Sequence, residues 1–183
     1  MPVTTLDPRT ALVVIDLQEG IRGFAPAEAF PGVVANAAAL LDAFRAKGLP
    51  VVLVNVAGGA PGRNEDPPRD WVFPDNFADL LPELKQQPSD HVVTKKTWGA
   101  FTGTGLDAWL KGRGVTQIVL CGVATSIGVE STARHAHENG FNVTLAVDAM
   151  TDRSAESHAH AIKAIFPRLG ETGTTQDIVA LLK

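Results

Sequence analysis

The chain has 183 residues, of which 45% are hydrophobic and 20% charged, and its formal net charge at pH 7 is −4. This composition is typical of a folded globular domain, and the lack of a basic block gives no support for binding nucleic acid or acidic membranes. The length suits a single domain over residues 1–183, and the single cysteine, Cys121, excludes an internal disulfide and favours a reducing, cytoplasmic location.

Five short apolar runs occur along the chain without polar alternation. They are ALVVIDL (11–17), VVLVNV (51–56), HVVTK (91–95), TQIVLCGV (116–123) and NVTLAVDA (142–149). Runs of this length, rich in β-branched residues, are typical of strands that are covered on both faces. The first run is too short for a membrane span and also carries Asp16, so no membrane partner is predicted.

Helical patterns separate these runs, over residues 33–47, 106–112, 128–139 and 154–168. Gly48, Gly140 and Gly170 follow three of these patterns, at the position where glycine commonly ends a helix. Alternating strands and helices predict a parallel sheet with right-handed crossovers. The expected fold is therefore α/β, a three-layer doubly wound domain with a mostly parallel sheet of five or six strands.

The rules for such folds indicate where a site would lie. In open parallel sheets, ligands bind beyond the carboxyl ends of the strands. The positions at or just after the ends of the predicted strands are 16–18, 55 onwards, 95 onwards, 123–128 and 148. The stretch 57–74, rich in glycine and proline, follows the second strand, and we expect it to form an active-site loop.

Two charged residues at these strand ends are candidates for catalysis. Partial burial of Asp16 would raise its pKa and suit it to general acid or base work, although a helix N-cap or a loop hydrogen bond would also explain it. Adjacent strand residues point to opposite faces, so only one of Lys95 and Lys96 can enter a shared site. A lysine beside Asp16 would hold the carboxylate and bind a substrate oxygen; a solvent-exposed charge is the alternative.

Metal and dinucleotide sites are not indicated. The histidine pairs His135/His137 and His158/His160 are spaced two residues apart, so the members of each pair diverge in a helix. The segment GTGLDA (103–108) fits a dinucleotide-binding pattern but does not directly follow a strand. We therefore predict no metal and no cofactor.

Two other side chains are candidate nucleophiles. Cys121 lies within the fourth apolar run, where a buried cysteine is usually a small hydrophobic residue. The segment ATSIG (124–128) resembles the nucleophile elbow of serine hydrolases, and Asp148 and His158 follow Ser126 in the order found in α/β-hydrolases. His158 falls within a predicted helix, which weighs against this triad without removing the alternative.

Three blocks of the sequence together resemble the isochorismatase-like, or cysteine hydrolase, superfamily. They are VVIDLQ (13–18), VTKKTWGAFTGTGLDAWL (93–110) and CGVATSIGVESTARHAHENGFNVTLAVDAM (121–150), and the resemblance extends over nearly the whole chain. For the amidases of that superfamily it implies a triad of Asp, Lys and Cys. Asp16 and Lys95 match the first two, and Gly128 stands in place of the cysteine. A glycine has no side chain to attack an amide, so covalent acyl-enzyme chemistry is excluded at that position.

Isochorismatases are similar to this sequence in having glycine there, and their reaction hydrolyses a vinyl ether. The resemblance implies that Asp16 is the general acid, that Lys95 holds a substrate oxygen and that Gly128 makes room. It also implies a cis peptide bond between Val123 and Ala124. The residues expected to bind substrate are Gln18, Arg63, Trp98, Val123, Ala124 and Thr125.

The sequence thus predicts an isochorismatase-like hydrolase that acts on a small molecule by general-acid hydrolysis without a covalent cysteine intermediate. Two alternatives stay open: a non-catalytic protein that binds a small molecule in the same pocket, and a hydrolase that depends on Ser126. The resemblance further implies a homo-oligomer, a dimer or tetramer, with no nucleic acid or membrane partner.

Overall fold

The computed structural model describes residues 2–65 and 73–182, which contain one sheet of six strands. The strand order is β3-β2-β1-β4-β5-β6, and every neighbouring pair is parallel. The strands are β1 (Thr10–Ile15), β2 (Val51–Val56), β3 (His91–Lys95), β4 (Gln117–Val123), β5 (Asn142–Thr151) and β6 (Glu171–Gly173). The five predicted strands are confirmed. The sixth, β6, was not predicted because three residues are too few to show a pattern.

The described part of the chain contains five α-helices: α1 (Phe30–Ala46), α2 (Leu106–Gly112), α3 (Glu130–Glu138), α4 (Ala155–His160) and α5 (Thr175–Leu181). Helix α1 begins before the predicted residue 33, because Pro31 fits a first helical turn, where its missing N–H is not needed. It ends just before Gly48, whose φ of +65° is the left-handed conformation typical of a helix end. None of these helices is both long and apolar enough to cross a membrane.

Two predicted helices differ from the structure. The pattern over 154–168 is divided into α4, a π-helical turn at Ala161–Ile165 and a 3-10 turn at Phe166–Arg168. Pro167 contributes to this division, since it has no N–H to continue an α-helix. The pattern over 128–139 starts earlier, because a π-helical turn at Thr125–Val129 precedes α3. Helix α5 was not predicted, although Thr174 and Asp177 form a capping box at its start.

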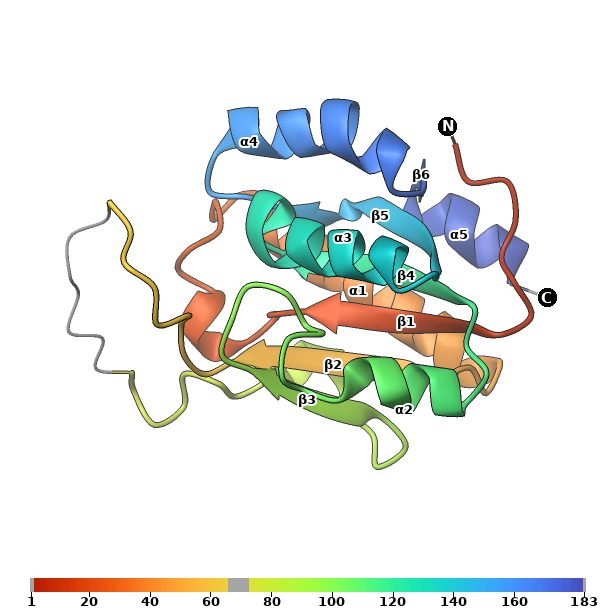
Figure 1. The fold of residues 1–183 in the computed structure, drawn as a ribbon, viewed down its shortest axis with the longest axis horizontal. Helices are drawn as coiled ribbons and strands as arrows, with labels where there is room; N and C mark the ends of the chain where they lie inside the picture. Colours follow the sequence, from red (N-terminus) through yellow and green to blue (C-terminus); the bar gives the residue numbers. More distant parts are fainter. Residues whose placement is uncertain (1, 66–72, 183) are drawn as a thin grey trace.

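The sheet lies between two layers of helices (Figure 1), and this confirms the predicted three-layer arrangement. Leu12 and Val14 of β1 point to the face that is covered by α1 and α5. Val13 and Ile15 point to the opposite face, where α2, α3 and the segment after α4 pack. Because β1 is buried on both faces, its side chains need no polar alternation, as its sequence indicated.

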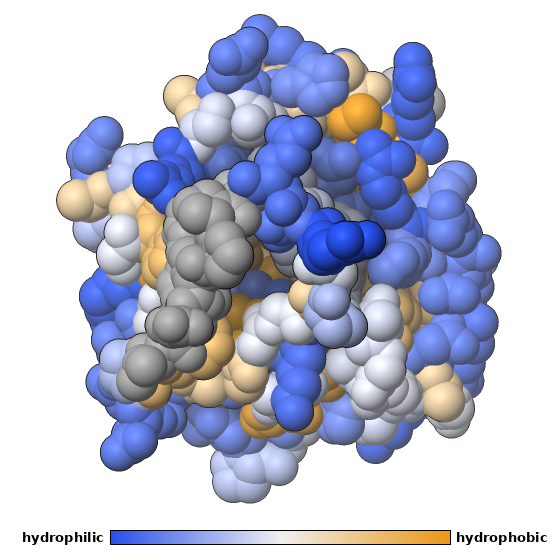
Figure 2. Space-filling model, turned by 60° about the vertical axis from the view of Figure 1, so that its left-hand side comes forward, coloured by the Kyte–Doolittle hydropathy of each residue, from blue (hydrophilic) through white to orange (hydrophobic). Residues whose placement is uncertain are grey.

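The strands end together at one edge of the molecule. In Figure 1, the arrows of β1, β2 and β3 point to the same side, and the predicted loop 57–74 leaves β2 on that side. Figure 2 shows this side of the surface, which is hollowed near the middle of the view and carries hydrophobic patches among hydrophilic side chains. Part of the predicted loop, residues 66–72, lies outside the described residues.

Candidate active site

Asp16 directly follows β1 and turns away from the path of the strand. Its φ is +51°, a left-handed conformation that is uncommon for residues other than glycine and that occurs more often at functional sites. Its backbone N–H donates a hydrogen bond to the carbonyl oxygen of Val54, 2.9 Å away, which keeps the turn attached to β2. The residue is 5% exposed, so its carboxyl group lies almost entirely within the protein.

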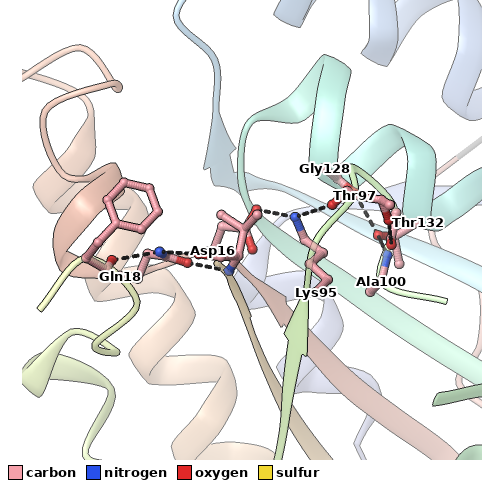
Figure 3. A network of polar contacts seen from close by, with 10 residues as sticks. Asp16, Gln18, Lys95, Thr97, Ala100, Gly128 and Thr132 are labelled. Carbon is pink, nitrogen blue, oxygen red and sulfur yellow. Dashed lines mark hydrogen bonds and ion pairs between the residues drawn. The ribbon is translucent and has the colours of Figure 1, made fainter. Parts of the chain in front are cut away.

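Lys95, the last residue of β3, reaches Asp16 across the end of β2. Its Nζ lies 2.7 Å from Asp16 Oδ2, and it also donates to the carbonyl oxygen of Thr97 at 3.1 Å (Figure 3). Lys95 is 2% exposed, whereas Lys96 is exposed. The structure therefore brings Lys95, and not Lys96, to the carboxyl group, as strand alternation allows.

The surroundings of Asp16 raise the pKa of its carboxyl group toward neutral pH. Burial raises the pKa of Asp16 from 3.8 to about 6, and the charge and hydrogen bond of Lys95 oppose this rise. Burial has the larger effect. Asp16 Oδ1 is buried and has no hydrogen-bond partner among the described residues, so this oxygen keeps its capacity to form a hydrogen bond.

Gly128 faces this pair from the π-helical turn that follows β4. A Cβ atom at position 128 would lie 3.3 Å from Asp16 Oδ2 and 3.0 Å from Cγ2 of Ile15. Any side chain at this position would therefore touch the carboxyl group. The structure brings together Asp16, Lys95 and Gly128, the three residues predicted from the sequence as catalytic, and the roles of these residues stay predictions.

The end of β4 brings this turn close to β1. Gly122 has a φ of +116°, and a Cβ there would clash with the carbonyl oxygen of Ile15, so only glycine fits. The peptide bond between Val123 and Ala124 is cis, as the resemblance implied. Thr125, which follows, is fully buried, and its hydroxyl group lies 2.8 Å from Nδ1 of His158.

The residues of the alternative serine triad do not meet. Ser126 Oγ donates to Asp152 Oδ2 at 2.8 Å, and the Ser126 N–H donates to the same oxygen. His158 contacts Thr125 instead of Ser126. Asp148 Oδ1 accepts hydrogen bonds from the N–H and the hydroxyl group of Thr175. This arrangement gives no support to a hydrolase that depends on Ser126.

Cys121 is not a candidate nucleophile. It is fully buried within β4, as its place in an apolar run indicated. Burial, and secondarily the nearby charge of Asp148, raise the pKa of its thiol to about 12. The reactive thiolate form is therefore scarce at neutral pH.

Two amide side chains hold the segment that leads back from the 57–74 loop. The Gln18 amide donates to the carbonyl oxygens of Val56 (3.0 Å) and Phe77 (2.8 Å), and its oxygen accepts from the Val56 N–H (2.7 Å). Asn55 donates to the carbonyl oxygen of Ala78, and its own Oδ1 is buried without a partner among the described residues. The Gln18 amide makes these backbone hydrogen bonds, and its predicted contact with substrate stays a prediction. Asn55, the next-to-last residue of β2, was among the strand-end positions taken from the sequence but was given no role there.

Two of the other predicted binding residues, Trp98 and Arg63, lie at the surface, whereas Val123 and Thr125 are buried. Trp98 is 64% exposed and follows β3, and Arg63 is exposed in the part of the 57–74 loop that the structure describes. A large exposed aromatic ring at this edge is available to a ligand or to a second copy of the chain. Substrate binding by these residues, and the homo-oligomer, stay predictions. Within residues 2–65 and 73–182, no group of three or more His, Cys, Asp or Glu side chains is placed to hold a metal ion.

The sequence model of the isochorismatase domain matches residues 10–177. The chain belongs to the isochorismatase family. Two proteins of similar size resemble it over nearly their whole lengths. The isochorismatase family protein YecD of Escherichia coli O157:H7 is 44% identical over 94% of this chain and 96% of its own. A solved isochorismatase family structure from Burkholderia thailandensis is 45% identical, covers 97% of each chain and has a TM-score of 0.91.

Other members of the isochorismatase family have named reactions. The ureidoacrylate amidohydrolase RutB of Rhizobium rhizogenes is 32% identical over 79% of this chain and 71% of its own. The probable isochorismatase of Pseudomonas chlororaphis is 28% identical over 96% of this chain and 87% of its own. The family thus includes relatives named for two different reactions.

Proposed function

We propose that this isochorismatase family member hydrolyses a small molecule by proton transfer from Asp16, without a covalent intermediate on the protein. The observation that carries the proposal is the state of the Asp16 carboxyl group: it is buried, it is paired through Oδ2 with Lys95, and its Oδ1 has no partner among the described residues. A carboxyl group with a pKa of about 6 can donate a proton near neutral pH and recover it within one turnover.

Among residues 2–65 and 73–182 we find no usable nucleophile beside the Asp16–Lys95 pair, and this favours the proposed chemistry over amide hydrolysis through an acyl-enzyme. Position 128, which faces Asp16, has no side chain. The Cys121 thiol is buried with a raised pKa, and the Ser126 hydroxyl group donates to Asp152, not to a histidine. Of the two reactions named among the relatives, the isochorismatase reaction is the one that needs no attacking side chain.

A vinyl ether is the bond type that this arrangement suits. Asp16 would donate its proton to the terminal alkene carbon, forming a C–H bond and leaving a positive charge shared by the adjacent carbon and the ether oxygen. Water would bond to that carbon and return a proton to Asp16. The hemiketal hydroxyl group would then lose its proton and form the C=O bond, while the bond to the former ether oxygen breaks and that oxygen takes up a proton. The products are an alcohol and a ketone, which is pyruvate when the ether is an enolpyruvyl group.

Lys95 has two tasks in this scheme. Its ammonium group stays within 2.7 Å of Asp16 Oδ2, so it orients the carboxyl group and stabilises the carboxylate that forms when the proton leaves. It would also hold a substrate oxygen, as the resemblance implied. Gly128 would leave room for the substrate beside the acid.

The direct test is pyruvate release from isochorismate by the purified protein, followed through lactate dehydrogenase and the loss of NADH. We expect release of pyruvate, and no release of ammonia from ureidoacrylate under the same conditions. A fluorophosphonate probe should leave Ser126 unlabelled. Ammonia release or labelling of Ser126 would contradict the proposal. Binding of isochorismate without turnover would favour the non-catalytic alternative.

The pKa of Asp16 also predicts the pH dependence. If the acid form reacts, kcat/KM should be level below about pH 6 and fall about tenfold per pH unit above it. The free energy of unfolding should also fall as the pH rises. The folded protein binds this proton more tightly than the unfolded chain does, so the contribution of Asp16 to the free energy of unfolding declines from about pH 4 to about pH 6. Rates and urea denaturation measured from pH 4 to 8.5 check both; a rate that rises through pH 6 would instead make Asp16 a base.

A further inference from the structure

One buried hydroxyl group connects the two segments that border the Asp16–Lys95 pair. Thr132 lies in the first turn of α3 and is fully buried. Its hydroxyl group donates to the carbonyl oxygen of Gly128 at 2.7 Å and accepts from the N–H of Ala100 at 3.1 Å (Figure 3). The same oxygen thus touches the turn that faces Asp16 and the segment that follows Lys95.

The two hydrogen bonds differ in kind. A threonine that donates to the carbonyl four residues earlier is a common local contact in helices. Here that carbonyl belongs to Gly128, at the π-helical turn before α3, so the contact holds the residue that faces the carboxyl group. The bond from Ala100 joins residues 32 positions apart, and no local preference of a helix accounts for it.

The Ala100 end of this connection leads to Lys95. Lys95 Nζ donates to the carbonyl oxygen of Thr97, and the Thr97 hydroxyl group donates to the carbonyl oxygen of Gly99. Gly99 packs so closely on α3 that a Cβ there would lie 2.7 Å from Nδ1 of His135. Within the described part of the chain, the Ala100–Thr132 bond is the only hydrogen bond between residues 96–101 and α3.

We propose that Thr132 is a positioning residue, whose hydroxyl group sets the geometry of the Asp16–Lys95 pair by holding the segments on both sides of it. The inference rests on the proposed function, in which this pair transfers the proton, and adds the side chain that holds the pair in place. Without the hydroxyl group, the buried Ala100 N–H loses its acceptor. Residues 97–100 are then less restrained, and so is the Thr97 carbonyl that holds the Lys95 ammonium group.

Three variants distinguish a positioning role of Thr132 from a contribution to the stability of the fold alone. Thr132→Val keeps the shape of the side chain and removes the hydroxyl group, and Thr132→Ser keeps the hydroxyl group. Thr144→Val is the matched control, because Thr144 is also fully buried and its Oγ1 accepts a hydrogen bond from Gln117, near the amino end of β5 and away from the site. All three are compared with the unmodified protein by thermal unfolding, by kcat and KM for the vinyl ether, and by a ¹³C NMR titration of the Asp16 carboxyl group.

For Thr132→Val we expect kcat to fall about 10- to 100-fold with little change in KM, because the pair is misplaced while the rest of the site is kept. The Asp16 titration should move to higher pH, since a less restrained Lys95 stabilises the carboxylate less. Thr132→Ser should restore most of both properties. Thr144→Val should lose thermal stability without either change.

An Asp16 titration and a kcat that are both unchanged in a folded Thr132→Val protein would overturn the inference and leave Thr132 a structural residue. If Thr132→Val does not fold, Thr132→Cys takes its place, because a thiol is a weaker donor and acceptor. An unchanged Asp16 titration in that variant would overturn the inference equally. If the unmodified protein hydrolyses no vinyl ether, the proposed function fails. The NMR titration still decides whether Thr132 sets the geometry of the Asp16–Lys95 pair.

Discussion

Replacing Asp16 by asparagine should lower kcat/KM for a vinyl ether by about 10²- to 10⁴-fold, the range that a positioned general acid contributes. Asparagine fills nearly the same space, so the change removes the acidic proton and leaves the shape of the site. The buried Lys95 ammonium group keeps the Thr97 carbonyl as a partner, which helps the variant to fold. Pyruvate release measured at pH 6, with circular dichroism and thermal unfolding on the same samples, checks the prediction.

Asp148→Asn is the control for this change. Asp148 also lies near the carboxyl end of a strand, β5, and is partly buried, but its carboxyl group accepts hydrogen bonds from Thr175 and lies outside the Asp16–Lys95 pair. We expect this variant to keep its activity. Retained activity in Asp16→Asn would show that Asp16 is not the acid, whatever the substrate.

Replacing Lys95 by methionine should lower kcat by about 10²- to 10³-fold, as does the loss of one charge-stabilising donor in other enzymes. Methionine keeps the length and the buried apolar part of the side chain but cannot stabilise the Asp16 carboxylate. The pKa of Asp16 should therefore rise above its present value of about 6, and the fall of kcat/KM with pH should begin at higher pH. The pH–rate profiles of the variant and of the unmodified protein measure both effects.

The adjacent residue provides the control for Lys95→Met. Lys96 has the same side chain at the next position but is exposed to solvent, so Lys96→Met should leave both the rate and the pH profile unchanged. The opposite pattern, with loss of activity in Lys96→Met alone, would show that the site uses the other lysine. Loss of activity without any movement of the pH profile would show that Lys95 does not set the pKa of Asp16.

The sequence predicted most of the sheet because a buried parallel strand has a strong local signal. β1, β2 and β4 are apolar almost throughout, and each has a helix or loop pattern after it. Shorter elements were missed: three residues of β6 show no periodicity, and α5 was signalled only by the Thr174/Asp177 capping box. The single predicted helix over 154–168 proved to be three short segments, because Pro167 and a π-helical turn interrupt it.

The sequence by itself determined the fold class, the edge of the sheet where Asp16, Lys95 and Gly128 lie, and the lack of a side chain at position 128. These depend on local patterns and on the rule that parallel strands end together. Only the tertiary structure decided that Lys95 Nζ pairs with Asp16 Oδ2, that the Gln18 amide binds backbone, and that Thr132 joins Gly128 to Ala100. It also decided that burial, which raises the pKa of Asp16, has a larger effect than Lys95, which lowers it. These contacts join residues far apart in the chain, and their distances and burial arise only when the strands and helices pack together.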